Sequence, residues 1–189
     1  MRTEALTGGF ADAPVEAAQV FRATLEALAR PGRIATVGGA EAPAPVSGAA
    51  AVLLLTLCDH ETPLFLAPGH DGPEVRDWVS FHTGAPLVGR EEATFALGHW
   101  PALAPLGAYR IGTPDYPDRS VSLIVEMEAL AARGARLTGP GIETEAFLSL
   151  PETEAFRRNN ARFPLGWDCF FTCGQSLAAL PRSTRVEEA

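Results

Sequence analysis

Four histidines and three acidic residues in the middle third of the chain are the first candidates for chemistry, because these side chains bind metal ions. They are His60, His70, His82 and His99, with Asp59, Glu61 and Asp71. No two of the histidines have the i, i+4 spacing of an H-E-x-x-H motif, and no C-x-x-C pair completes a zinc site. We therefore expect solvated histidines on loops and helix ends, and no metal site.

Two cysteines near the C-terminus, Cys169 and Cys173, suggest redox chemistry. Their aromatic neighbours favour a strand, in which four residues span about 13 Å. A disulfide needs Cα atoms less than about 7 Å apart. We therefore interpret both, together with Cys58, as buried structural thiols.

A glycine-rich stretch, Leu137-Thr138-Gly139-Pro140-Gly141-Ile142, resembles loops that present backbone N–H groups to a phosphate. Pro140 removes one of those donors, and no basic residue follows. We interpret the stretch as a turn, with ligand contact as the alternative.

Other catalytic classes find no support. There is no G-x-S-x-G motif, and the pairs Glu91-Glu92 and Glu187-Glu188 lie in polar contexts that indicate solvation. Lysine is absent, since all fifteen basic residues are arginine, as a GC-rich genome would favour. A Schiff base with pyridoxal phosphate and a P-loop are therefore excluded.

The totals describe one globular domain over residues 1–189, with 47% hydrophobic and 20% charged residues. A net charge of −8 argues against nucleic-acid binding, which needs a basic surface. The longest apolar stretch is about ten residues, and a membrane span needs about 20. Residues 1–13 lack the apolar core of an export signal. We expect a cytoplasmic protein without a membrane segment.

Two helices are predicted in the first third of the chain. The first has an apolar stripe that we expect to face the core, made of Val15, Ala18, Phe21, Leu25 and Leu28. Pro31-Gly32 ends this helix. Ser47 is placed to cap a second helix, which is apolar on every side over Ala49 to Cys58 and should be buried.

Strands and helices then alternate. Strands are predicted at residues 34–37, 62–66, 94–97, 121–130 and 136–138, and helices start near Pro73 and Pro151. In the strand 121–130, Glu126 and Glu128 share a face opposite the apolar residues. The chain closes with a hairpin that turns at Gly174-Gln175. This order predicts an α/β fold, with a mixed sheet flanked by helices.

Several short motifs together resemble one known family. They are Phe21-Arg22 with Pro31-Gly32; Leu53 to Leu57 with Asp59; Phe81-His82-Thr83 with Ala85 to Val88; Leu137 to Gly139; and Phe163 to Gly166 with Asp168, Thr172 to Gly174, Pro181-Arg182, Thr184 and Val186. Their order and spacing over nearly the whole chain resemble the PhnH family, subunits of the bacterial carbon–phosphorus lyase complex. Residues 99–119 match least.

The resemblance implies a small fold similar to that of pyridoxal-phosphate-dependent transferases, without their activity. It implies a homodimer that assembles with the subunits PhnG, PhnI and PhnJ. The complex exchanges the adenine of ATP for methylphosphonate, which yields α-D-ribose 1-methylphosphonate 5-triphosphate. PhnJ later cleaves the C–P bond with an iron–sulfur cluster, which takes about four cysteines. This chain has three, so we expect an assembly subunit that binds no cofactor itself.

The family motifs supply no catalytic residue. Their polar members His82, Thr83, Asp168 and Arg182 are the candidates for a functional or interface role. Asp168 and Arg182 lie on the two arms of the hairpin, so we expect a cross-strand ion pair that fixes it. The alternative function is a free-standing protein that binds a phosphonate or nucleotide, or hydrolyses it, with arginines and histidines in a closed pocket.

Overall fold

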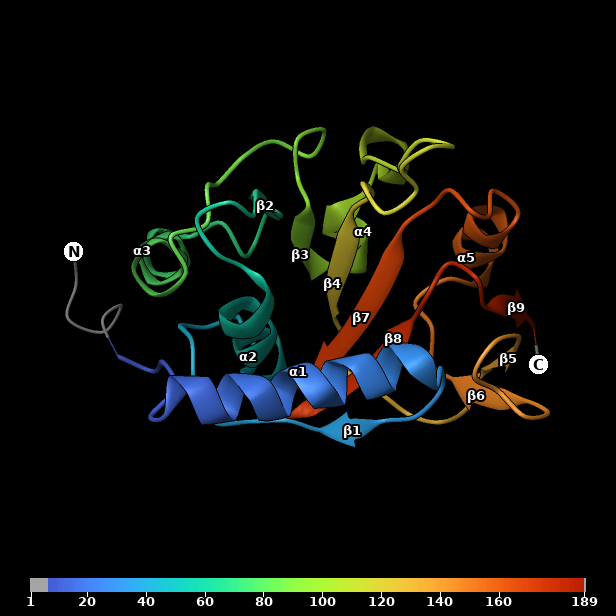
Figure 1. Ribbon diagram of the computed structural model, residues 1–189, viewed down its shortest axis with the longest axis horizontal. Coiled ribbons are helices and arrows are strands. Elements are labelled where there is room, and N and C mark those ends of the chain that lie inside the picture. The colour runs from blue at the N-terminus through green and yellow to red at the C-terminus, as the bar shows by residue number, and fades with distance from the viewer. Residues whose placement is uncertain (1–6, 189) are drawn as a thin grey trace.

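A mixed six-stranded sheet, in the order β1-β8-β7-β4-β3-β2, forms the centre of the structure, a computed structural model that describes residues 7–188 (Figure 1). Strands β2, β3, β4 and β7 are parallel, whereas β8 and β1 run antiparallel to their neighbours. The strands are β1 (Ala35–Thr36), β2 (Leu64–Leu66), β3 (Phe95–His99), β4 (Ser122–Glu126), β7 (Asp168–Cys173) and β8 (Ser176–Leu180).

A second, antiparallel sheet has the order β6-β5-β9 and covers part of one face of the first. Its strands are β5 (Ala135–Thr138), β6 (Ala146–Leu148) and β9 (Arg185–Glu187). The helices are α1 (Ala13–Ala29), α2 (Gly48–Leu57), α3 (Pro73–His82), α4 (Trp100–Leu103), α5 (Thr153–Asn160) and the 3-10 helix η2 (Leu106–Ala108). The α/β class with a mixed sheet is therefore confirmed.

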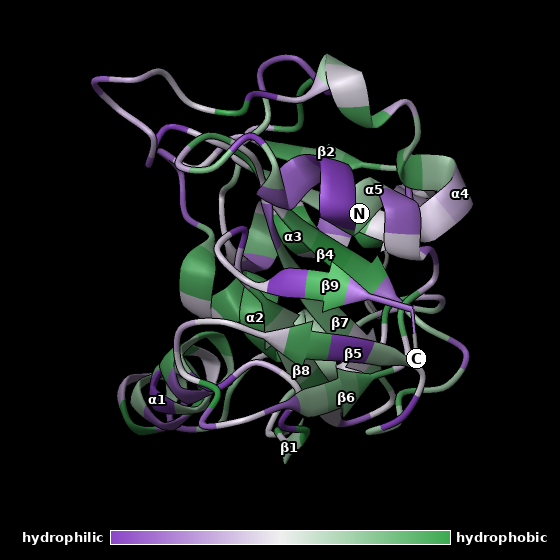
Figure 2. Ribbon diagram, turned by 90° about the vertical axis from the view of Figure 1, so that its right-hand side faces the viewer, coloured by the Kyte–Doolittle hydropathy of each residue, from purple (hydrophilic) through white to green (hydrophobic). Residues whose placement is uncertain are grey.

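Both faces of the large sheet are covered, as a sheet with parallel strands requires. Side chains alternate along each strand, so Ile124 and Phe170 join a core with α1, α2 and α3. Leu123 and Phe171 face the other way, into a core with α4, α5 and the small sheet. Figure 2 shows hydrophobic residues concentrated on the inner strands and α2, and hydrophilic residues on α5.

Helix α2 confirms its prediction. Ser47 is its N-cap, and the hydroxyl of Ser47 accepts a hydrogen bond of 3.2 Å from the backbone N–H of Ala50. All six residues from Ala49 to Leu54 are fully buried, as predicted, whereas Leu55 to Leu57 at the end of the helix are partly exposed. The helix packs against both α1 and the sheet, where an all-apolar surface is stable.

Helix α1 corrects the prediction of its core-facing stripe. It buries Val20, Thr24 and Ala27, on the side that packs against α2 and β8. Phe21 and Leu25, expected in the core, have about half of their surface exposed (47% and 50%). Small residues let the helix lie close to α2, so the larger apolar residues of the same helix point outward.

The strand predicted over residues 121–130 is shorter and is buried on both faces. It ends at Glu126, and Glu126 itself is only 6% exposed. Glu126 lies on the face opposite Leu123 and Val125, as alternation predicted. That face is also covered, because β4 is a central strand between β3 and β7.

The C-terminal hairpin is confirmed, with a turn at Gly174, where φ is +58°. Strands β6 and β9 and helix α4 were not predicted, because three or four residues carry too short a pattern. Within residues 7–188, no helix is both long and apolar enough to cross a membrane. The predicted absence of an export signal concerns residues 1–13. Residues 1–6 of this stretch lie outside the part of the chain that the structure describes.

Candidate functional site

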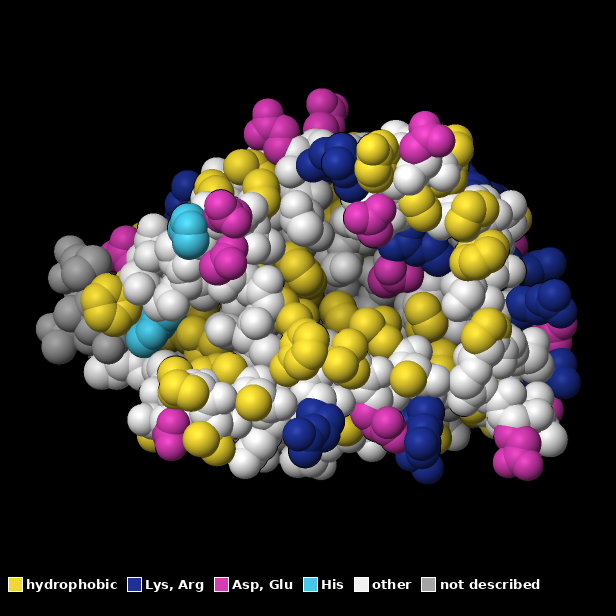
Figure 3. Space-filling model, in the orientation of Figure 1, with side chains coloured by type: hydrophobic (Ala, Val, Ile, Leu, Met, Phe, Trp, Pro, Cys, Tyr) yellow, Lys and Arg dark blue, Asp and Glu magenta, His cyan; other side chains and the backbone are white. Residues whose placement is uncertain are grey.

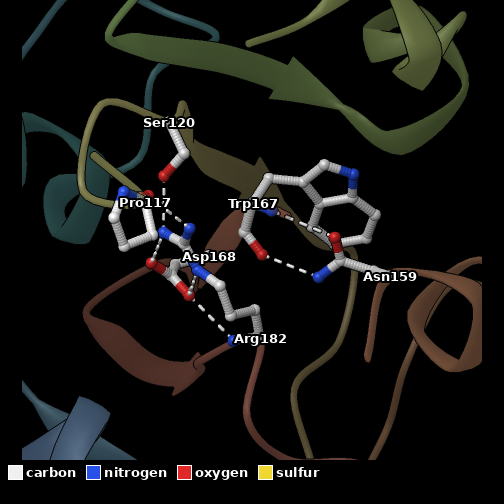
Figure 4. A network of polar contacts seen from close by, with 6 residues as sticks. All are labelled: Pro117, Ser120, Asn159, Trp167, Asp168 and Arg182. Atoms are coloured by element: carbon white, nitrogen blue, oxygen red, sulfur yellow. Dashed lines mark hydrogen bonds and ion pairs between the residues drawn. The ribbon is translucent and has the colours of Figure 1, made fainter. Parts of the chain in front are cut away.

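Asp168 and Arg182 form the most connected ion pair in the described part of the chain (Figure 4). Asp168 starts β7, and Arg182 follows β8 by two residues. The carboxylate accepts hydrogen bonds from the backbone N–H of Arg182 at 2.8 Å and from its Nε at 3.1 Å, and the guanidinium also reaches Oδ2 at 2.5 Å. The expected ion pair is therefore present, although Arg182 lies in the turn after β8 and not at the strand position facing Asp168.

Arg182 also connects the hairpin to the segment that precedes β4. Its guanidinium donates to the carbonyl of Pro117 at 2.8 Å and to the hydroxyl of Ser120. Its side chain is only 12% exposed, and that of Asp168 is 23% exposed. Because the charges of the two side chains face each other, neither presents a free charge to a ligand.

Asn159, at the end of α5, braces the chain just before β7. Its amide donates to the carbonyl of Trp167 at 2.8 Å, and its side-chain oxygen accepts from the N–H of Trp167 at 3.0 Å (Figure 4). Gly166 has a φ of +129°, and a Cβ there would lie 2.5 Å from Oδ1 of Asn159. Asn159 was not predicted, because only its contact with a backbone distant in sequence reveals its role.

His82 and Thr83 lie at the other end of the molecule, at the end of α3 (Figure 1). The structure therefore does not bring them together with Asp168 and Arg182. The ring of His82 lies with its Nε2 3.2 Å from the carbonyl of Thr7, which also accepts from Trp78. The hydroxyl of Thr83 donates to Val79 and accepts from Ala85, so Thr83 closes the helix end.

Two of the four histidines, His70 and His99, are in contact. Their rings lie edge to face, with centroids 5.0 Å apart, and Nδ1 of His99 is 3.0 Å from the carbonyl of Glu126. His70 is fully buried, which corrects the prediction of a solvated side chain. Burial, and secondarily His99, lowers the pKa of His70 to about 4. Among the described residues no group of three possible metal ligands occurs.

Glu126 places a buried carboxylate at the carboxyl ends of the parallel strands, where α/β proteins often bind ligands. Here the carboxylate is itself bound by the chain. It accepts from the N–H of Ser47 at 2.7 Å and from the hydroxyl of Thr172 at 2.9 Å. The carboxylate thus lies at the N-terminus of α2, the position where a helix favours negative charge.

The three cysteines are free thiols. Cys58 and Cys169 are buried, whereas Cys173 is partly exposed. Burial raises the pKa of Cys58 to about 12 and raises that of Cys169 as well. The prediction of buried structural thiols therefore holds for two of the three.

These observations define an α/β protein whose predicted polar candidates contact its own chain. The model of the PhnH family, described as a bacterial phosphonate metabolism protein, matches residues 8–187. The chain is 37% identical over 195 residues to the α-D-ribose 1-methylphosphonate 5-triphosphate synthase subunit PhnH of Rhizobium meliloti (strain 1021), with 98% of each chain covered. It is 29% identical over 201 residues to HtxG of Stutzerimonas stutzeri, a candidate C-P lyase subunit, with 94% of each covered. The chain belongs to the PhnH family.

Proposed function

We propose that this chain is an assembly subunit of the carbon–phosphorus lyase core, without catalytic activity of its own. In that role it would contribute to the synthesis of α-D-ribose 1-methylphosphonate 5-triphosphate from ATP and methylphosphonate. The name of the Rhizobium meliloti relative supports the reaction. A homodimer, the partners PhnG, PhnI and PhnJ, a cytoplasmic location and the absence of a bound cofactor belong to the same proposal, as does a fold similar to pyridoxal-phosphate-dependent transferases.

The exposed apolar face of α1 carries the proposal. Val15, Phe21 and Leu25 are each about half exposed, and Ile34, which follows the helix, is 37% exposed. Figure 3 shows hydrophobic side chains gathered over α1 on this side of the molecule. Val15, Ala18 and Leu25 recur at helical spacing, so they form one stripe. Contiguous apolar surface of this kind marks protein–protein contacts.

The polar candidates support an assembly role in a second way. Asp168, Arg182 and Thr83 use their polar atoms to hold segments of this chain together. A catalytic group must instead reach the proton or atom that it acts on in a bound substrate. We therefore expect no turnover by the isolated protein, and we expect a partner subunit of the core to cover α1.

A charge placed on α1 tests the proposal. Leu25→Arg should abolish co-purification with PhnG, PhnI and PhnJ and abolish growth on methylphosphonate, because a buried unpaired charge is costly. Arg158→Gln, which changes an exposed arginine of α5 away from the α1 face, is the control and should leave both unchanged. Since Leu25 is half exposed, the variant should unfold at a temperature close to that of the unmodified protein.

Two outcomes would contradict the account. Normal co-purification of Leu25→Arg would show that α1 does not contact the core complex. Loss of a homodimer with retention of the core complex would assign the α1 face to a second copy of this chain instead.

A further inference from the structure

Three segments that are distant in sequence form one groove beside the small sheet. They are the turn after β5, the end of α5 with the residues that follow it, and the chain that leads from β8 into the start of β9. The groove has a volume of about 490 Å³ and is lined by Gly139, Pro140, Asn160, Phe163, Ser183 and Arg185. It therefore includes the glycine-rich turn, where the donor removed by Pro140 and the missing basic partner were the two arguments against a phosphate site.

Arg185 supplies that basic partner from β9. Its strand position pairs with Thr138, next to the turn. Its guanidinium forms no ion pair with any residue between 7 and 188. On the same face of this sheet, Arg136 is instead held by Glu145 and Glu187. The positive charge of Arg185 is thus available to an anion in the groove.

Phe163 supplies an aromatic surface in the same groove. Its side chain is 60% exposed, more than any other exposed large hydrophobic residue among those described. An exposed ring of this kind offers its face to a nucleobase, and stacking of bases on aromatic side chains stabilises binding in proteins that bind nucleic acids.

At Gly139, the turn after β5 lies close to the backbone at Ser183. The φ of this residue is +129°, which favours glycine, and a Cβ would lie 3.3 Å from the carbonyl oxygen of Ser183.

We propose that this groove binds a nucleoside phosphate, with the base on the ring of Phe163 and a phosphate oxygen on the guanidinium of Arg185. The choice of a nucleotide among phosphorylated ligands rests on the proposed function, which makes ATP a substrate of the complex. The groove itself rests on the geometry of this chain alone. Most of its surface is apolar, and its cation Arg185 has no ion pair with residues 7–188, as in sites that orient a ligand through a few polar groups.

A titration of the full-length isolated protein with ATP, followed by ¹H–¹⁵N NMR, tests this site. Saturable shifts are expected at the backbone amides of Gly139, Phe163, Ser183 and Arg185. Arg185→Gln should weaken ATP binding about tenfold, as the loss of one charge-assisted contact implies.

The aromatic contact has its own test. Phe163→Ala should also weaken ATP binding about tenfold, but it should leave the weaker binding of inorganic triphosphate unchanged. Matched controls are Arg22→Gln, an exposed arginine of α1, and Phe81→Ala, a phenylalanine that is 52% exposed on α3. Both should bind ATP as the unmodified protein does.

Absence of saturable shifts at millimolar ATP would overturn the proposal, and so would unchanged affinity in Arg185→Gln. Equal affinity for triphosphate and ATP, with no effect of Phe163→Ala, would overturn the nucleotide assignment. Co-purification of Arg185→Gln with the core separates the two proposals. A variant that assembles but no longer binds ATP fits both, whereas ATP binding by a chain that never assembles would refute only the proposed function.

Discussion

Replacement of Asp168 by asparagine removes the negative charge from the pair with Arg182 and keeps the shape of the side chain. The backbone N–H of Arg182 can still donate to an amide oxygen at this position. The guanidinium, however, keeps its partners Pro117 and Ser120 and loses its counter-ion. We therefore expect a destabilised protein that still folds.

The burial of the pair sets the size of the effect. Removing one partner of a fully buried ion pair costs about 3–5 kcal/mol, whereas an exposed pair contributes about 0.2–1 kcal/mol. Side-chain exposures of 12% and 23% place this pair between the two cases, nearer to the buried one. We expect a loss of about 2–3 kcal/mol in the free energy of unfolding. For a chain of this size that corresponds to a fall in melting temperature of roughly 4–12 °C.

Thermal and urea unfolding, followed by circular dichroism, measure this loss. The matched control is Glu145→Gln, which breaks an ion pair with Arg136 whose side chains are 39% and 45% exposed. It should cost less than about 1 kcal/mol. If Asp168→Asn is no more destabilising than Glu145→Gln, the pair does not fix the hairpin. If stability is unchanged and only co-purification with the core is lost, Asp168 belongs to an interface.

Three further predictions follow from buried groups. In the native protein at pH 8, Cys173 should react with a thiol reagent while Cys58 should not, because burial raises the pKa of Cys58 to about 12; equal labelling rates would refute this. The folded-state pKa of His70, about 4, lies below its unfolded value of about 6.5, so its contribution to stability is present above pH 6.5 and is lost as the pH falls toward 4. Between pH 7 and 5 the unfolding free energy of the unmodified protein should fall by about 2 kcal/mol more than that of His70→Phe. An equal fall in the two proteins would contradict this prediction. Thr172→Val should cost about 1–3 kcal/mol, because it removes a hydrogen bond from the buried carboxylate of Glu126; unaltered urea unfolding would show that this bond contributes nothing.

Elements with a strong local pattern could be predicted from the sequence. The all-apolar run of α2, its Ser47 cap and the turn at Gly174 each depend on neighbouring residues, and each occurs as expected. The Asp168–Arg182 pair could also be predicted, because the antiparallel hairpin brings the start of one arm close to the end of the other, although Arg182 itself lies beyond the ladder.

Features that depend on long-range packing could not be predicted from the sequence. Glu126 is buried because β4 is central and because Ser47 and Thr172, distant in sequence, bind its carboxylate. The stripe on α1 has the period of a core-facing helix, and a periodic pattern does not tell core from partner surface. The groove at Arg185 requires three segments to meet, and the spacing within any one of them does not reveal it.

The mass of the assembled complex tests the central claim most directly. The tagged chain would be co-expressed with the proposed partners PhnG, PhnI and PhnJ, purified through the tag and measured by light scattering. Our account predicts a stable assembly far above the mass of a dimer of this 20.0 kDa chain. A dimer or monomer that leaves the three partners behind would contradict it.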